Sequence, residues 1–130
     1  MDTQAFYRTV WERLGQSDRE EAQRGAAAVL HALRDRSTPD EADQVAAQLP
    51  GALKAVWAEG ERPDRTPVRM DREEFYERVR EEVGARTARE IEWLTLAVFA
   101  TLKQQLSEGE ANDVMAQLPL DLKEAWVEAV

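Results

Sequence analysis

Residues 41–50 read EADQVAAQLP, and residues 110–119 read EANDVMAQLP. The two stretches are 69 residues apart, and the same offset aligns residues 1–61 with residues 70–130 without a gap. The identical pairs along this alignment include Phe6 and Phe75, Val10 and Val79, Gly15 and Gly84, Leu33 and Leu102, Leu53 and Leu122, and Trp57 and Trp126. Such self-similarity is typical of a structural unit that occurs twice.

Each copy of this unit is predicted to form four helices. Capping boxes, in which a hydroxyl and a later glutamate satisfy free amides at a helix start, mark the second and third helices of both copies. These boxes are Ser17 with Glu20, Thr38 with Glu41, Thr87 with Glu90, and Ser107 with Glu110, and Asp71 with Glu74 is a near variant. The expected helices span residues 3–14, 18–36 and 39–48 in the first copy, and 87–106 and 108–117 in the second. Pro50 and Pro119 should end the third helix of each copy and open the fourth.

Residues 59–69 are expected to form a connector. Gly60 and two prolines exclude a continuous helix there, and the polar composition favours an extended segment on the surface. We therefore predict an all-α protein, with residues 1–58 and 70–130 as two tandem, pseudo-symmetric four-helix repeats packed into one helical bundle.

The two copies differ most in their second helices. The first copy carries glycine and alanines at residues 22–32, whereas the second carries bulky apolar residues at 91–102. A helix that is apolar on nearly every side is normally buried. We expect the bulky helix to lie at the centre of the bundle. The alternative is that Trp93 and Leu96 form the face of a homodimer.

The composition restricts the classes of function. The chain has a formal net charge of −9 and no strongly basic cluster, which argues against binding to nucleic acid. No apolar run approaches the ~20 residues that cross a bilayer, and the polar N-terminus lacks the features of a secretory signal. The absence of cysteine fits a reducing compartment. We expect a protein of the cytoplasm without a membrane span.

The repeated unit resembles the bacterial family known as domain of unknown function 2267. The motifs that carry the resemblance are Phe6-x-x-x-Val10 with Gly15, Ala28-Val29-Leu30-x-x-Leu33, the Glu41-Ala42 to Ala47-Gln48-Leu49-Pro50 element, their second copies, and the connector Gly60-x-Arg62-Pro63. Glu61 departs from the pattern, because an aromatic residue often stands there. The resemblance implies an all-helical bacterial protein with no established activity, and it supplies no catalytic residue.

The residues themselves predict no catalytic, metal or cofactor site. His31 is the only histidine, so neither a zinc site nor a di-iron site of the Glu-x-x-His type can be assembled. We expect His31 to be a partly exposed helix residue without a special role. The abundant glutamates could bind a divalent cation, but arginines interleaved with them favour a solvated helix face.

Four residues are candidates for a contact surface. Gln48 and Gln117 each end a helix before Leu-Pro, where they could bond free backbone groups or contact a partner. Trp11 and Trp93 have no tryptophan at the aligned position of the other copy, and tryptophan is enriched at binding hot spots. Burial between the two copies is the alternative for both tryptophans.

We therefore expect a non-enzymatic interaction, adaptor or structural protein that recognises an unknown protein partner or a second copy of itself. The alternative is a protein that binds a small ligand between the two repeats. An enclosed apolar pocket would favour the ligand, and an exposed apolar patch or open groove would favour the partner.

Overall fold

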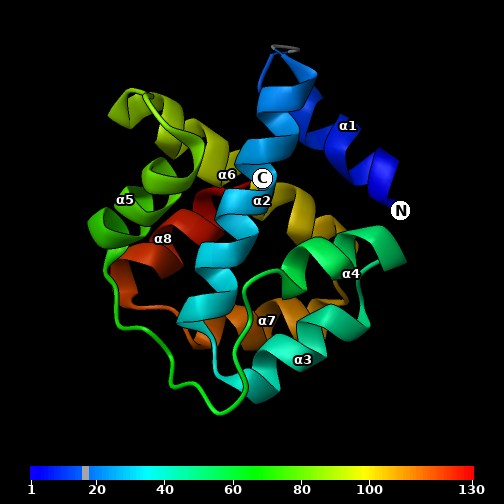
Figure 1. The fold of residues 1–130 in the computed structure, drawn as a ribbon, viewed down its shortest axis with the longest axis vertical. Helices are drawn as coiled ribbons and strands as arrows, with labels where there is room; N and C mark the ends of the chain where they lie inside the picture. Colours follow the sequence, from blue (N-terminus) through cyan, green and yellow to red (C-terminus); the bar gives the residue numbers. More distant parts are fainter. Residues whose placement is uncertain (16–17) are drawn as a thin grey trace.

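The computed structural model describes residues 1–15 and 18–130, which form an all-α bundle (Figure 1). The eight helices of the described residues are α1 (Thr3–Arg13), α2 (Arg19–Arg36), α3 (Pro39–Ala47), α4 (Gly51–Ala58), α5 (Arg72–Val83), α6 (Ala88–Gln105), α7 (Glu108–Ala116) and α8 (Leu120–Glu128). Each helix from α5 to α8 begins 69 residues after its counterpart among α1 to α4. The all-α prediction is confirmed, and the helix order keeps the offset seen in the sequence.

Two of the predicted capping boxes form completely. At α6, the Thr87 hydroxyl accepts from the Glu90 amide and the Glu90 carboxylate accepts from the Thr87 amide. Asp71 and Glu74 make the same reciprocal pair at α5. These ends are set by residues within one turn of each other, which is why the sequence locates them well.

The other predicted boxes differ from expectation. Thr38 and Ser107 cap α3 and α7 by accepting from the amide three residues later, but the glutamate side chains do not complete the box. Side chains from the opposite half take that place, as described below. The box expected at Ser17 involves a residue outside the described ranges, and Asp18 is the N-cap residue of α2.

The bulky helix α6 lies at the centre, as predicted. It packs against α1, α2, α5, α7 and α8. Its buried residues are Ile91, Leu94, Thr95, Ala97, Val98, Phe99, Ala100, Thr101 and Leu102. Burial is not complete, however, because the Trp93 side chain is 56% exposed. Trp93 is therefore not buried between the halves.

The small residues of α2 allow α6 to come close. A Cβ atom placed on Gly25 would lie 2.7 Å from both Cδ atoms of Leu94. Gly25 and Leu94 occupy aligned positions in the two halves. The tip of Leu94 therefore occupies the space that a side chain at position 25 would take.

The connector runs from α4 to α5 along the lower edge of Figure 1. Most of its side chains are exposed, yet the segment is fixed to the end of α2. Arg65 donates to the backbone carbonyls of Arg34 and Ser37, and the Val68 amide donates to the Asp35 carbonyl. These donors bond carbonyls at the end of a helix, where the helix itself supplies few donors. The connector is thus a bound segment rather than a free linker.

A cation also caps the fourth helix of each half, and it is buried in the first half and half-buried in the second. The Arg34 guanidinium, 3% exposed, donates to the carbonyls of Trp57 and Glu59 at the end of α4. At the aligned position in α6, the Lys103 ammonium donates to the carbonyls of Trp126 and Ala129 at 2.7 Å each. Burial lowers the pKa of Lys103.

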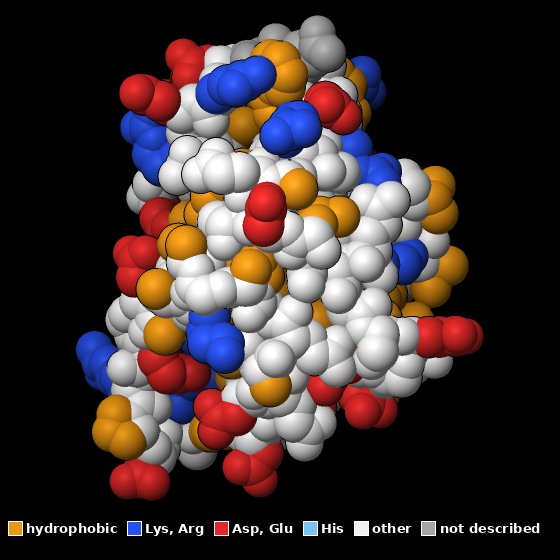
Figure 2. Space-filling view, turned by 90° about the vertical axis from the view of Figure 1, so that its right-hand side faces the viewer, with side chains coloured by type: hydrophobic (Ala, Val, Ile, Leu, Met, Phe, Trp, Pro, Cys, Tyr) orange, Lys and Arg blue, Asp and Glu red, His pale blue; other side chains and the backbone are white. Residues whose placement is uncertain are grey.

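The surface mixes hydrophobic and charged groups. Figure 2 shows the right-hand side of Figure 1, which carries α1, α3 and α4, and there hydrophobic side chains are interspersed with charged ones. Within residues 1–15 and 18–130, no helix has the length and apolar character that spanning a membrane requires.

Candidate functional site

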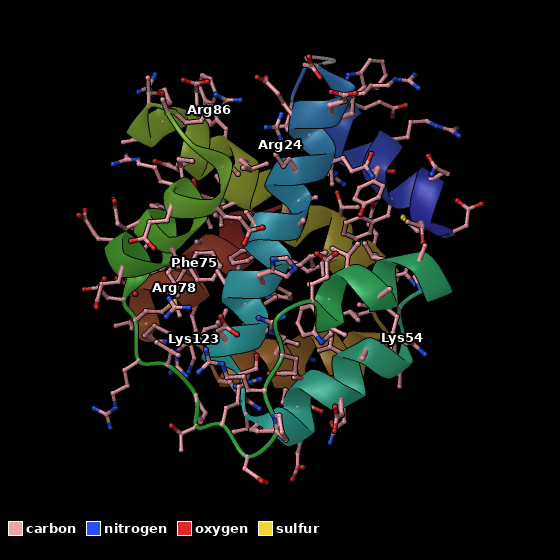
Figure 3. All side chains as sticks on the ribbon, viewed as in Figure 1. Arg24, Lys54, Phe75, Arg78, Arg86 and Lys123 are labelled. Carbon is pink, nitrogen blue, oxygen red and sulfur yellow. The ribbon has the colours of Figure 1, made fainter. Side chains whose placement is uncertain are left out.

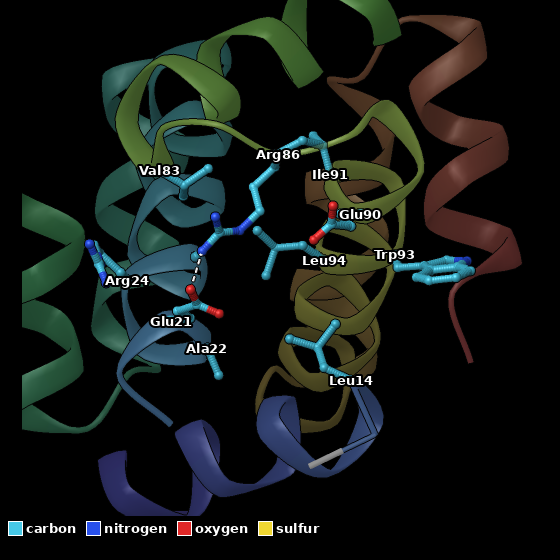
Figure 4. Close-up of a pocket in the computed structure, with 11 residues that line it drawn as sticks. Leu14, Glu21, Ala22, Arg24, Val83, Arg86, Glu90, Ile91, Trp93 and Leu94 are labelled. Carbon is cyan, nitrogen blue, oxygen red and sulfur yellow. Dashed lines mark ion pairs between the residues drawn. The ribbon is translucent and has the colours of Figure 1, made fainter. Parts of the chain in front are cut away.

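A hollow of about 230 Å³ opens between the two halves, with α2 and α6 on its two sides, the end of α5 above it and α1 below it (Figure 4). Its lining residues are Leu14, Glu21, Ala22, Arg24, Gly25, Val83, Arg86, Glu90, Ile91, Trp93 and Leu94. Most of them form pairs at the 69-residue offset, such as Ala22 with Ile91 and Gly25 with Leu94. The hollow therefore lies where equivalent surfaces of α2 and α6 meet.

The floor of the hollow is apolar and its rim is charged. Leu94 reaches from α6 toward α2, and Leu14 closes the lower side in Figure 4. Arg86 crosses the opening to form an ion pair of 2.6 Å with Glu21. Glu90 stands at the same rim, and the hydrogen bond from the Thr87 amide lowers the pKa of its carboxyl.

Arg24 and Arg86 both lie at the upper end of the molecule in Figure 3, beside the opening. The rim therefore carries both signs of charge within a short span. Such an arrangement places polar groups around an apolar floor, which is the general pattern of sites that bind an apolar group and orient it.

Trp93 stands at the boundary between this hollow and a second one. The second hollow, of about 430 Å³, is lined by Arg13, Leu14, Trp93, Leu96, Ala97, Ala100, Glu128, Ala129 and Val130. The Trp93 ring projects from the outer side of α6, away from the floor of the first hollow (Figure 4). The Arg89 guanidinium lies 5.7 Å from the ring centroid, within the range of a cation–π contact. We call Trp93 and the two hollows beside it the Trp93 surface.

Trp11 does not belong to the Trp93 surface. It is half-buried on α1 and lines a different small hollow, together with Tyr7 and Gln23. The Arg19 guanidinium lies 4.4 Å from the centroid of the Trp11 ring. Trp11 thus packs within the first half, so the structure does not bring the two candidate tryptophans together.

Gln48 and Gln117 lie on the side of the bundle where α3 meets α7, and each contacts the opposite half. The Gln48 side-chain oxygen accepts from the Ser107 amide at 2.8 Å, and the Gln117 oxygen accepts from the Thr38 amide at 3.0 Å. Thr38 and Ser107 are the N-cap residues of α3 and α7. Gln48 therefore supplies the acceptor that was expected from Glu110, and Gln117 supplies the acceptor that was expected from Glu41.

His31 also joins the halves. Its Nδ1 lies 3.0 Å from the Glu82 carboxylate on α5, and its Nε2 lies 2.7 Å from the Val56 carbonyl oxygen on α4. Both partners are acceptors, so the ring donates to both of them only when it carries two protons. Sequence reasoning assigned no role to His31, because its partners come from distant parts of the chain.

The comparison with known families decides the classification. Residues 3–125 match the family described as "Uncharacterized conserved protein (DUF2267)". The chain belongs to the DUF2267 family. The resemblance inferred from the repeated Glu-Ala to Gln-Leu-Pro element is thereby confirmed. A search of the curated proteins finds no match.

Sequence reasoning did not find the hollow. The signal was present in the alignment of the two halves, where Arg24 faces Trp93 and Gly25 faces Leu94 in sequence register. A change from small or charged to bulky at aligned positions shows that two equivalent surfaces have become different. Leu94 fills the space directly above Gly25, and the hollow lies beside this contact.

Proposed function

We propose that this protein is a non-enzymatic binding module that holds an amphipathic helix of a protein partner against the Trp93 surface. The observation that carries the proposal is the 56% exposure of Trp93, a large aromatic side chain, on the central helix α6. A tryptophan can bury about 150–250 Å² when it is covered, so leaving it in water forgoes a substantial gain. A partner that covers Trp93 would recover that gain.

The shape of the surface favours a helix as the occupant. Hollows lie on both sides of Trp93, and apolar side chains one turn apart on a helix could enter both of them. The mixed charges of Glu21, Arg24 and Glu90 at the rim suit the polar flank of an amphipathic helix. A cytoplasmic setting, which the composition favours, is part of this proposal.

The second candidate function is a small apolar ligand in the inter-half hollow. The apolar floor favours it, but the volume of about 230 Å³ is smaller than the roughly 300–1,000 Å³ of most small-molecule pockets. A single bulky side chain from a partner fits this volume better. A second copy of the chain is the remaining occupant to be tested.

The test places a photoreactive amino acid at position 96, which lines the second hollow beside Trp93, and identifies what crosslinks to it in native cell extract. Binding of the purified crosslinked partner is then measured with Trp93→Ala and with Leu120→Ala, which removes an apolar side chain that is 75% exposed on α8. We expect a loss of affinity of about tenfold or more for Trp93→Ala and little change for Leu120→Ala, since buried aromatic anchors dominate interfaces.

Three results would contradict the proposal. Partner binding that survives Trp93→Ala would place the contact elsewhere. Concentration-dependent self-association that is abolished by Trp93→Ala would make a second copy the occupant. A metabolite that raises the melting temperature of the wild type but not of a variant with the hollow filled, such as Val83→Phe, would favour the small ligand.

A further inference from the structure

Two buried glutamates meet where α3 packs against α7. Glu41 and Glu110 are 6% and 7% exposed, and they occupy aligned positions in the two halves. Glu41 Oε1 and Glu110 Oε2 are buried atoms without a hydrogen-bond partner among the described residues. A buried carboxylate without a partner is costly, so this arrangement calls for a group that neutralises it.

The hydrogen bonds that Gln48 and Gln117 accept from the opposite half, here called the crossed glutamine contacts, explain why these carboxylates do not cap their own helices. In a complete capping box, the carboxylates of Glu41 and Glu110 would accept from the amides of Thr38 and Ser107. Those amides instead donate to glutamine side chains of the opposite half. The two glutamates therefore do not bond the amides at their own helix starts. Their carboxylates lie near each other at the contact between α3 and α7, which is the seam between the halves.

A third carboxylate completes the cluster. Asp113 lies one turn after Glu110 on α7 and is exposed to solvent. One carboxylate oxygen from each of Glu41, Glu110 and Asp113 lies within 4.8 Å of the other two. Oxygens on opposite sides of a Ca²⁺ ion are about 5 Å apart, because each sits about 2.3–2.6 Å from the metal. The three oxygens can therefore share one ion.

We propose that Glu41, Glu110 and Asp113 bind one hard divalent cation at the seam between the two halves. All three ligands are carboxylates, which select Ca²⁺, Mg²⁺ or Mn²⁺ rather than metals that prefer sulfur or imidazole. The exposed side of Asp113 leaves room for water molecules to fill the remaining coordination positions. The ion would link α3 to α7 and thereby hold the halves together. This inference does not depend on the Trp93 surface.

A proton competes with the ion for the same oxygens. Burial of Glu41, together with the carboxyls of Glu110 and Asp113 on α7, raises the pKa of Glu41 to about 8. A metal must displace that proton to bind, so its affinity increases with pH. Binding is therefore expected to be stronger at pH 8.5 than at pH 6.

The test uses the purified full chain after treatment with EDTA and its removal. Ca²⁺, Mg²⁺ and Mn²⁺ are titrated separately by isothermal calorimetry at both pH values, and melting temperatures are recorded with and without each ion. We expect one ion per chain for at least one of the three metals. Glu41→Gln, Glu110→Gln and Asp113→Asn should each weaken its binding about tenfold or more.

Asp43→Asn is the matched control, because it removes the same charge from an exposed position on α3 outside the cluster. It should leave the affinity unchanged. The proposal is overturned if none of the three metals binds the wild type more tightly than about 10⁻³ M, the weak end of protein calcium sites. It is also overturned if Glu41→Gln, folded by circular dichroism, binds as tightly as the wild type. Either result would mean that Glu41 and Glu110 hold a proton between them and do not bind a metal ion.

Discussion

Replacing Glu41 with glutamine is expected to change how the free energy of unfolding depends on pH. Burial and the neighbouring carboxyls raise the pKa of Glu41 from 4.5 to about 8 in the folded protein. Between these values the folded protein keeps a proton that the unfolded chain has lost. The stabilising contribution of Glu41 is therefore complete below about pH 4.5 and is lost as the pH rises through 8.

The magnitude follows from the size of that change. Each pKa unit corresponds to about 1.4 kcal/mol, so a rise from 4.5 to about 8 sets a ceiling of about 5 kcal/mol. Water that reaches the cluster beside the exposed Asp113 reduces this value, and we expect about 2 kcal/mol. Because glutamine does not ionise, Glu41→Gln should match the wild type near pH 5 and exceed its stability by about 2 kcal/mol near pH 9.

Urea unfolding followed by circular dichroism at several pH values between 5 and 9 measures this difference. EDTA is present throughout, so that no divalent cation contributes. Asp43→Asn serves as the control, since it removes an acid from α3 without touching the cluster. If the stability curves of the wild type and Glu41→Gln run parallel over this range, Glu41 does not hold a proton in the folded state and the reasoning fails.

Further predictions concern packing. Leu49→Ala and Leu118→Ala should each cost about 2–5 kcal/mol, because both leucines are buried; urea midpoints within error of wild type would show that α3 and α7 do not pack inward. Gly25→Ala should change stability by less than about 1 kcal/mol, because the gain in helix propensity offsets the displacement of the Leu94 tip into the hollow; a loss above about 3 kcal/mol in the same assay would contradict this. Arg34→Met should cost about 2–4 kcal/mol, because buried carbonyls at the end of α4 lose their donor; an unchanged thermal melt would show that water replaces it.

The helix starts were predictable because their determinants are local. Thr87 and Glu90, and Asp71 and Glu74, sit within one turn of each other and satisfy each other's amides as the motif predicts. Prolines and glycines mark the other ends, and Gly84 adopts a φ of +89° where a helix end was expected. Information of this kind is contained in a few neighbouring residues and needs no knowledge of the fold.

The contacts between the halves were not predictable in the same way. The motif at Thr38 and Glu41 is identical in form to the one at Thr87 and Glu90, yet only the latter forms a complete box. The difference arises because the Thr38 amide donates to Gln117, which is distant in sequence, instead of to Glu41. Local motifs cannot show which of two competing acceptors the tertiary structure will supply.

The sequence named Trp93 as a candidate contact residue but left its exposure open, for a related reason. The apolar character of α6 predicts burial for the helix as a whole, and nine of its residues are indeed buried. Average hydrophobicity does not tell which single side chain lacks a covering element. That depends on how far α1 and α5 extend over α6, which is a property of the packed bundle.

The crossed glutamine contacts have a consequence for the integrity of the molecule. Since α3 and α7 each begin at an amide satisfied by the opposite half, neither half is complete when it stands alone. A tryptic cut after Arg69, an exposed residue at the end of the connector, should leave both fragments associated, and the pieces should elute together on gel filtration. The protein would then behave as a split pair that reassembles, in which the peptide bond between the fragments sets only their local concentration.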